Sequence, residues 1–259
     1  MIPKIIHFCW LSDDEFPPLI KKCMDSWKEK LSDYEFVHWN TDKFNMESSL
    51  WVQQAFEVKK YAFAADYIRL YAVYHYGGIY LDTDIEVIKR FDDLLNRPYF
   101  AGTEGERIIE AGVFGAVKGS AWLKQCLSYY ENRSFIKPDG SFDTMTLPRI
   151  MMKQISKTKT FETVLPETIT PEEQNKDTST MYLFPKDHFC AKNHGTGQIE
   201  KTKNTYCIHH FAMSWVDKNH TFLPNIKRKL MRVLGVKFVD SVIKILGLRK
   251  IKKLFKRTS

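Results

Sequence analysis

The chain has 259 residues, of which 44% are apolar, 27% charged and 14% aromatic, a composition typical of a globular core rich in Tyr and Phe. It excludes a disordered or collagen-like chain, and we find no apolar run long enough to span a bilayer as a helix. The net charge of +8 is unevenly placed. Residues 225–259 hold 12 basic residues and one acidic residue, whereas residues 1–224 hold 27 basic and 30 acidic residues. The acidic body gives no reason to expect nucleic-acid binding.

The start of the chain and its cysteines bear on the compartment. Residues 1–10 lack a basic segment followed by a long apolar stretch and a small-residue cleavage site, so we expect a first strand there and no signal peptide. The five cysteines are scattered and form no Cys-x-x-Cys pair, which predicts neither a zinc site nor a disulfide framework. These features favour a reducing cytoplasm.

Strand-like and helix-like segments alternate through the first half of the chain. From the spacing of the apolar residues, the predicted order is strand 4–10, helix 17–27, strand 34–39, helix 55–76 and strand 79–81. Two glycines, Gly77 and Gly78, predict a left-handed cap at the end of the long helix. This alternation indicates an α/β layered sheet.

The second half of the chain is less regular. Residues 111–117 favour another central strand, in which two glycines allow a close backbone approach. The polar segment 163–179 contains two prolines and is predicted to be a loop, and residues 206–215 are predicted to be a strand that leads into a site. We therefore expect a single domain over residues 1–224.

Residues 225–259 form a basic tail with a helical pattern. Apolar residues recur there at spacings of three or four, basic residues occupy much of the remaining surface, and Gly235 and Gly247 divide the run into short helices. Basic amphipathic helices lie in the headgroup plane of anionic membranes. The tail predicts a peripheral protein on the inner face of the membrane. The alternative is that its helices pack on residues 1–224 and leave the lysines in solvent.

The sharpest chemical feature is a pair of aspartates directly after the predicted strand 79–81. Asp82 and Asp84 are two residues apart, and side chains that follow a strand of an open α/β sheet lie at the edge where ligands bind. Their hard oxygen atoms suit Mg²⁺ or Mn²⁺, which usually completes its shell with phosphate oxygens. The alternative is a chance Asp-x-Asp in a surface turn.

Two other aspartate motifs are excluded by neighbouring residues. A phosphotransferase of the haloacid dehalogenase type usually has Thr or Val two positions after the second aspartate, where this chain has Glu86. An EF-hand loop needs Gly at its sixth position, which is Val87 here.

The helix before this strand carries a second pair of charges. Asp66 and Arg69 are three residues apart, so both side chains lie on one helical face. The same face carries Ala62, Ala65 and Ala72, which indicates that it faces the core or a cleft. An exposed helix ion pair is the alternative.

Four segments together resemble the glycosyltransferases of family 32, which carry the sugar-binding region with the DXD motif. The family includes fungal Golgi mannosyltransferases and bacterial capsule or lipopolysaccharide enzymes, with the clostridial glucosylating toxins as distant relatives. The resemblance is nearly continuous over residues 1–95, and it rests on the segments Ile2–Trp10, Tyr34–Asn40, Asp66–Asp84 and Asn204–Trp215.

The resemblance implies a GT-A fold, with a Rossmann-like mixed sheet flanked by helices, and a divalent cofactor, Mn²⁺ or Mg²⁺. It implies retaining transfer of a hexose or N-acetylhexosamine from a nucleoside diphosphate sugar, with UDP favoured. The acceptor would be a glycan or a lipid-linked glycan in capsule, exopolysaccharide or lipopolysaccharide assembly. We see no convincing enzymic nucleophile, so the acceptor hydroxyl would attack from the face that the diphosphate leaves.

Carried over position by position, the resemblance gives the motif residues their roles. Trp10 would stack on the base of the donor. Asp66 and Arg69 would bind the sugar hydroxyls and the diphosphate, and Arg69 would also stabilise the charge on the leaving group. Asp82 would contact ribose, sugar or metal, and Asp84 would bind the metal directly. Asp66, Arg69 and Asp82 are therefore the expected catalytic residues.

The last motif would complete the metal and phosphate sites. Strand alternation points the rings of His209 and His210 to opposite faces, which leaves the third ligand ambiguous. We expect His210 at the metal, and Ser214 and Trp215 close to the phosphates.

The acceptor cleft is expected to be lined from the middle of the chain by Glu110 and Gly112, although both could equally be strand residues. A metal-dependent glycoside or phosphoester hydrolase is a second candidate class, and a non-enzymatic membrane-surface protein is a third. A hydrolase needs a water-activating base for which we see no suitable candidate. A surface protein has no need of the four charged motif residues.

Overall fold

The computed structural model describes residues 1–105, 108–193 and 196–212. Two predicted features, the basic tail and the end of the main domain at residue 224, lie outside the described residues. In the described part of the chain, no helix is both long and apolar enough to cross a membrane.

The chain divides into two compact units. The first consists of residues 1–191 and 201–212 and holds every helix and strand that the structure describes. The second consists of residues 192–200 and 213–259, and its described part is a turn with a bridge between Lys192 and Ile199.

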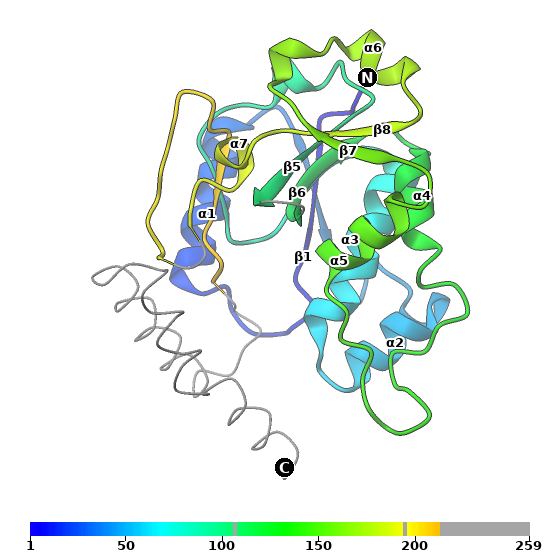
Figure 1. Ribbon diagram of the computed structural model, residues 1–259. Coiled ribbons are helices and arrows are strands. Elements are labelled where there is room, and N and C mark those ends of the chain that lie inside the picture. Colours follow the sequence, from blue (N-terminus) through cyan, green and yellow to red (C-terminus); the bar gives the residue numbers. More distant parts are fainter. Residues whose placement is uncertain (106–107, 194–195, 213–259) are drawn as a thin grey trace, which may run out of the picture. The chain divides into compact units, whose positions relative to one another are not determined.

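A five-stranded mixed sheet forms the centre of the first unit (Figure 1). Its strands are β1 (Ile5–Cys9), β2 (Glu35–Trp39), β3 (Gly78–Leu81), β5 (Tyr99–Gly105) and β6 (Ile108–Ala116). The order is β2-β1-β3-β6-β5, with β1 parallel to β2 and β3, and β6 antiparallel to β3 and β5. The mixed α/β sheet expected from the sequence is confirmed.

Two small sheets accompany the central one. The antiparallel pair is β4 (Ile85–Val87) with β9 (Cys207–His209), and the parallel pair is β7 (Thr160–Thr163) with β8 (Thr180–Leu183). The β4–β9 pair joins residues far apart in the sequence and lies next to the predicted aspartate site.

Seven helices and three single 3₁₀ turns complete the described residues. The helices are α1 (Pro18–Lys30), α2 (Leu50–Glu57), α3 (Tyr61–Tyr76), α4 (Ala121–Leu127), α5 (Leu147–Ile155), α6 (Pro171–Lys176) and α7 (Lys186–Phe189). The 3₁₀ turns are Met46–Ser48, Asp92–Leu94 and Pro166–Thr168.

The long helix predicted for residues 55–76 is two helices. Lys59 has a φ of 57°, a left-handed conformation that breaks the chain between α2 and α3. The predicted cap is confirmed, because Gly77 has a φ of 70° and its amide donates to the Val73 carbonyl.

The prediction of a loop over residues 163–179 is wrong, because this segment contains a 3₁₀ turn and α6. Thr170 and Glu173 form a capping box at the start of α6, and Pro171 occupies the first helical position. These signals were present in the sequence. Arg97 holds the segment in place by donating to the carbonyls of Pro166 and Ile169 and to the Gln174 side chain.

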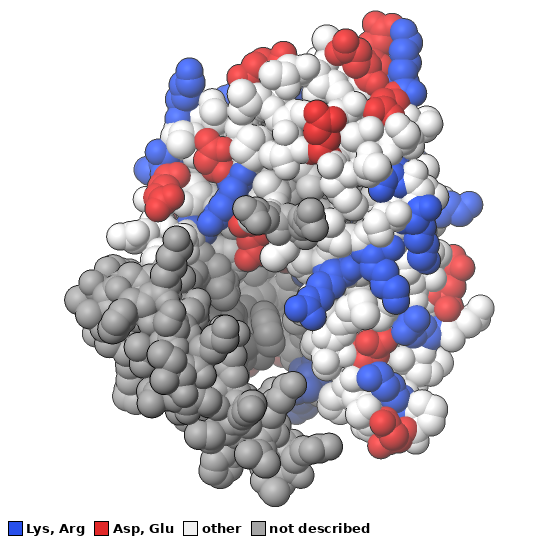
Figure 2. Space-filling model, in the orientation of Figure 1, with Lys and Arg blue, Asp and Glu red and all other residues white. Residues whose placement is uncertain are grey.

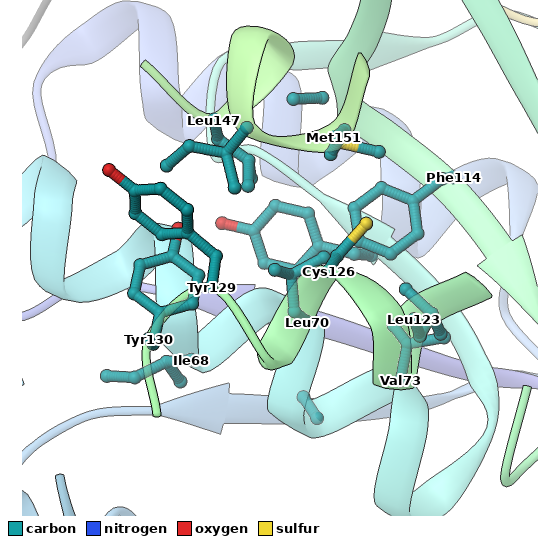
Figure 3. Close-up of a cluster of buried hydrophobic side chains, with 14 of the residues drawn as sticks. Ile68, Leu70, Val73, Phe114, Leu123, Cys126, Tyr129, Tyr130, Leu147 and Met151 are labelled. Atoms are coloured by element: carbon teal, nitrogen blue, oxygen red, sulfur yellow. The ribbon is translucent and has the colours of Figure 1, made fainter. Parts of the chain in front are cut away.

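The two faces of the sheet pack into separate hydrophobic clusters. On β3, Tyr80 belongs to one cluster, whereas Ile79 and Leu81 belong to the other, as the period of two in a strand requires. Figure 3 shows part of the first cluster, in which the sheet meets α3, α4 and α5 through side chains that include Ile68, Leu70, Val73, Phe114, Leu123, Cys126, Leu147 and Met151. The second cluster includes Trp27 of α1. A sheet covered on both faces explains why its strands are almost entirely apolar.

Candidate active site

The turn after β3 presents the two aspartates at one edge of the sheet. The Ile85 amide donates to the Asp82 carbonyl at 3.0 Å and closes the turn, while the Asp82 amide donates to the Gly112 carbonyl of β6 at 2.7 Å. Because β1, β2 and β3 are parallel, their carboxyl ends meet at this edge. Asp82 and Asp84 therefore lie where open α/β sheets bind ligands.

The helix α3 brings Asp66 and Arg69 to the same place. Arg69 lies 3.2 Å from Asp66 Oδ1 through Nη2 and 3.1 Å from Asp82 Oδ1 through Nη1, and it donates to the Ala111 carbonyl at 2.9 Å. Its guanidinium also lies 4.7 Å from the centre of the Tyr80 ring. Only 9% of the Arg69 side chain is exposed. This is a buried charge network, not an exposed helix ion pair.

Burial governs the charge state of two of these carboxyl groups. It raises the pKa of Asp66 to about 6, with Arg69 opposing the shift and Asp82 adding to it. The Leu147 amide, at the start of α5, bonds the Asp66 carboxylate and partly offsets its burial. Burial likewise raises the pKa of Asp82, against the attraction of Arg69.

The strand β9 brings His209 to the aspartates. Antiparallel pairing places His209 opposite Ile85, and the amides of His210 and Ala212 donate to the Asp84 carbonyl at 3.0 Å and its carboxylate at 2.7 Å. His209 Nε2 lies 3.4 Å from Asp84 Oδ1. Burial acts to raise the pKa of Asp84, but His209 and the Ala212 amide outweigh it and lower that pKa to about 2.

Three side chains of the described residues fit a divalent cation. Asp82, Asp84 and His209 each offer one ligand atom, and these atoms lie within 4.8 Å of one another. Two carboxylates and an imidazole form a donor set that suits Mn²⁺ and similar ions. Gly112 leaves room beside them, since a Cβ there would lie 2.9 Å from Asp82 Oδ2 and from His209 Cε1.

The rings of the two histidines point in opposite directions, as expected, but the structure reverses the predicted assignment. His210 Nε2 lies 2.7 Å from Glu86 Oε2, and Glu86 Oε1 lies 3.2 Å from Lys22. His209 faces the aspartates instead. The register of the β4–β9 ladder decides this, so His209 replaces His210 in the predicted ligand set.

Glu110 and Gly112 were predicted to line the acceptor cleft, and the structure corrects this for Glu110. The residue is only 2% exposed, and its Oε1 accepts from the Gly112 amide at 2.7 Å and lies 3.1 Å from His209 Nδ1. Burial acts to raise the pKa of Glu110, but His209, the Gly112 amide and the Cys190 thiol outweigh it and lower that pKa. Glu110 thus lies behind His209 in the interior.

Trp10 follows β1 at the same edge of the sheet and is half-buried. Its indole N–H donates to the Asp14 carbonyl at 2.9 Å, and its ring lies 5.0 Å from the ring of Phe16, centre to centre. Its stacking on a base stays a prediction. Ser214 and Trp215 lie outside the described residues.

The sequence reasoning missed Tyr80, whose hydroxyl donates to Asp82 Oδ1 at 2.9 Å. A signal was available, because residues two apart on a strand share a face and Tyr80 precedes Asp82 by two.

This chain is similar in sequence to known glycosyltransferases over part of its length. Residues 17–101 match the family described as glycosyltransferase sugar-binding region containing DXD motif. Inositol phosphoceramide mannosyltransferase 3 of Schizosaccharomyces pombe is 32% identical over 128 residues, which cover 48% of this chain and 36% of that protein. Mannosyl phosphorylinositol ceramide synthase SUR1 of Saccharomyces cerevisiae is 31% identical over 143 residues, with 52% and 37% coverage. The chain thus matches little more than a third of the length of these relatives.

Two solved structures match this chain with TM-scores below 0.5. The PaToxG glycosyltransferase has a TM-score of 0.48 and 20% identity, over 60% of this chain and 68% of that one. A glycosyltransferase involved in glycosylation of the major capsid of PBCV-1 has a TM-score of 0.32 and 16% identity, over 52% and 71%.

Proposed function

Since residues 17–101 carry the DXD sugar-binding region of the glycosyltransferases, we propose that the protein is a metal-dependent glycosyltransferase. It would move a hexose from a nucleoside diphosphate sugar to a hydroxyl group of a glycan or glycolipid acceptor. The observation that carries the proposal is the convergence of Asp82, Asp84 and His209 at the edge of the sheet, next to the buried Asp66–Arg69 pair.

Each of the charged residues at the sheet edge would have its own role in the transfer reaction. A divalent ion held by Asp82, Asp84 and His209 would act as a Lewis acid toward the leaving diphosphate. Asp84 is suited to hold a cation because its pKa of about 2 keeps it ionised near neutral pH. Arg69 fixes the carboxylates of Asp66 and Asp82 and offsets part of their charge. Its predicted contact with the diphosphate would need one of its N–H groups to turn toward the donor.

The stereochemical course belongs to the proposal as well. The resemblance implies retention, which would follow if the acceptor hydroxyl attacks the anomeric carbon on the face that the diphosphate leaves. The bond to the diphosphate oxygen breaks as the new glycosidic bond forms, and a leaving phosphate oxygen accepts the hydroxyl proton. A fold of the GT-A type, with the donor across the edge of the parallel strands, suits this geometry.

The names of two relatives support the choice of donors to test. One is named an inositol phosphoceramide mannosyltransferase and the other a mannosyl phosphorylinositol ceramide synthase, so we propose to test GDP-mannose first, beside the UDP-sugars that the family resemblance favours. Capsule, exopolysaccharide or lipopolysaccharide assembly on the inner membrane face is the setting we propose, with the tail 225–259 as the contact to anionic lipid.

A donor panel tests the function. The full chain is incubated with UDP- and GDP-sugars, with and without Mn²⁺ or Mg²⁺, and release of the nucleoside diphosphate is measured. We expect release from one donor only, dependent on the metal and stimulated by an acceptor glycan or glycolipid. No metal-dependent turnover of any donor would contradict the proposal, and cleavage of glycosides without a nucleotide would favour a hydrolase.

A further inference from the structure

We infer that Glu110 is a positioning residue that fixes the ring of His209 for metal binding, a role that rests on the proposed function. His209 lies between two carboxylates, with Nδ1 3.1 Å from Glu110 Oε1 and Nε2 3.4 Å from Asp84 Oδ1. An ionised carboxylate accepts hydrogen bonds and donates none, so it keeps a proton on Nδ1. The lone pair that can meet a cation is then on Nε2, which faces the aspartates.

Glu110 is itself held in one orientation. Its Oε1 accepts from the amide of Gly112, two residues further along β6, at 2.7 Å. The absence of a side chain at Gly112 permits this contact, since a Cβ there would lie 2.9 Å from Glu110 Oε1. With only 2% of the residue exposed, the carboxylate does not turn into solvent. The main chain of β6 therefore sets the direction of the His209 ring.

The burial of Glu110 calls for a reason beyond packing. Burying a carboxylate costs several kcal/mol before its partners compensate, and an apolar side chain of similar volume avoids that cost. His209 and the Gly112 amide, both at Oε1, and the Cys190 thiol compensate part of this cost, whereas Oε2 is buried with no hydrogen-bond partner among the described residues. Because Glu110 is enclosed behind His209, it acts on the site through that ring and does not touch the substrate.

The test measures Mn²⁺ binding to the full chain without donor, from the electron paramagnetic resonance signal of free Mn²⁺. Glu110→Gln should weaken binding about 10- to 100-fold, as loss of a partner of a metal-bound histidine does. The glutamine oxygen can still accept from the Gly112 amide and from Nδ1–H, but the negative charge is lost, so the proton on Nδ1 is held more weakly. His209→Ala should weaken binding as well, and the double variant should bind no more weakly than His209→Ala alone.

A matched control is Glu104→Gln. Glu104, on the neighbouring strand β5, interacts electrostatically with Glu110 and His209 but makes no hydrogen bond to His209 in the described part of the chain. This variant therefore controls for the loss of a nearby charge, and it should weaken Mn²⁺ binding far less than Glu110→Gln does. The ring-nitrogen chemical shifts of His209 provide a readout independent of activity. In the Mg²⁺-loaded protein the proton should be on Nδ1, and in Glu110→Gln the form with its proton on Nε2 should become measurably more populated.

The possible outcomes distinguish a failure of the positioning role of Glu110 from a failure of the proposed metal site. Unchanged Mn²⁺ affinity in Glu110→Gln, or losses that simply add in the double variant, would overturn the positioning role. If Asp84→Asn also binds Mn²⁺ unchanged, the metal site of the proposed function has failed instead. If Glu110→Gln does not fold, Glu110→Asp keeps the charge but shortens its reach. Weakened binding in that variant supports the role, and unchanged binding overturns it.

Discussion

Asp84 is the residue on which the proposed metal binding depends most directly. Its carboxylate accepts the Ala212 amide at 2.7 Å, and its pKa of about 2 keeps it charged, so Asp84→Asn removes a ligand charge with little change in shape. We expect loss of Mn²⁺ binding and a fall in sugar transfer of about a hundredfold or more. Asp139→Asn, on an exposed turn, is the control and should have no effect. Metal-dependent transfer at the normal rate in Asp84→Asn would refute the site.

Gly112 offers a steric test of the same site. In Gly112→Ala the new Cβ would lie 2.9 Å from atoms of Asp82, Glu110 and His209, closer than real Cβ contacts allow, so these groups must shift. We expect Gly112→Ala to bind Mn²⁺ more weakly and to transfer sugar more slowly. Its melting temperature should change little, because the crowding is confined to the site. Gly105→Ala adds the same methyl group where no atom of the described residues, apart from its chain neighbours, lies within 4 Å, and it should behave like the unmodified protein. Equal behaviour of the two variants would contradict the crowding argument.

At the level of single residues, some contacts of the site could be predicted from the sequence and others could not, for physical reasons. The pairing of Asp66 with Arg69 followed from helical spacing, and Asp82 and Asp84 followed from their place after a strand. The choice of His209 over His210 depended on the register of a ladder between segments more than a hundred residues apart. The register of the β4–β9 ladder cannot be predicted from the local sequence of either strand.

Among the elements, the segment 166–174 is tied to the rest of the unit by the buried side chains of Arg97 and Gln174, and Arg97 makes most of these hydrogen bonds. Arg97 is 6% exposed and donates to two main-chain carbonyls and to Gln174, so Arg97→Ala leaves these acceptors without a donor. Each buried unsatisfied group costs about 1–3 kcal/mol, and we expect the free energy of unfolding in urea to fall by about 2 kcal/mol or more.

The control for this change is Thr170→Ala, which removes only the cap of α6 and should cost about 1 kcal/mol. If the free energy of unfolding falls less in Arg97→Ala than in Thr170→Ala, the hydrogen bonds of Arg97 do not stabilise the segment 166–174. Proteolysis within residues 166–174 should also become faster in Arg97→Ala alone.

The elements themselves were predicted best where the apolar pattern was long. The strands β1, β2 and β3 and the cap at Gly77 matched the sequence expectation because buried runs and glycine turns are local signals. The break at Lys59 was missed because a left-handed non-glycine residue has no compositional mark. The helix α6 was not predicted because a polar segment with two prolines is typical of a loop, although one of these prolines occupies the first helical position.

Across the whole molecule, charge separates the body from the tail. Figure 2 shows both signs of charge spread over one face of the described residues, whereas residues 225–259 are overwhelmingly basic. We expect the full chain to bind anionic vesicles through this tail. Changing Lys252, Lys253 and Lys256 to Gln should weaken vesicle binding by about 3 kcal/mol, roughly a hundredfold, at about 1 kcal/mol for each lysine.

The matched variant changes three exposed lysines of the body, Lys124, Lys153 and Lys157, to Gln. It removes the same charge and should leave co-sedimentation with vesicles unchanged. Equal losses in the two triple variants, or binding that does not weaken as salt rises, would count against a membrane role for the tail.

The pairing of β4 with β9 ties the site to the order in which the chain is made. A ribosome delivers the two aspartates well over a hundred residues before His209, and such a distant contact forms late in folding. A chain that ends after β6 but before His209 therefore has the residues of the five-stranded sheet and both carboxylates but lacks the imidazole that completes the donor set. Such a chain should therefore bind a divalent ion more weakly than the full chain does. The complete metal site that we propose is present only in chains that extend past residue 209.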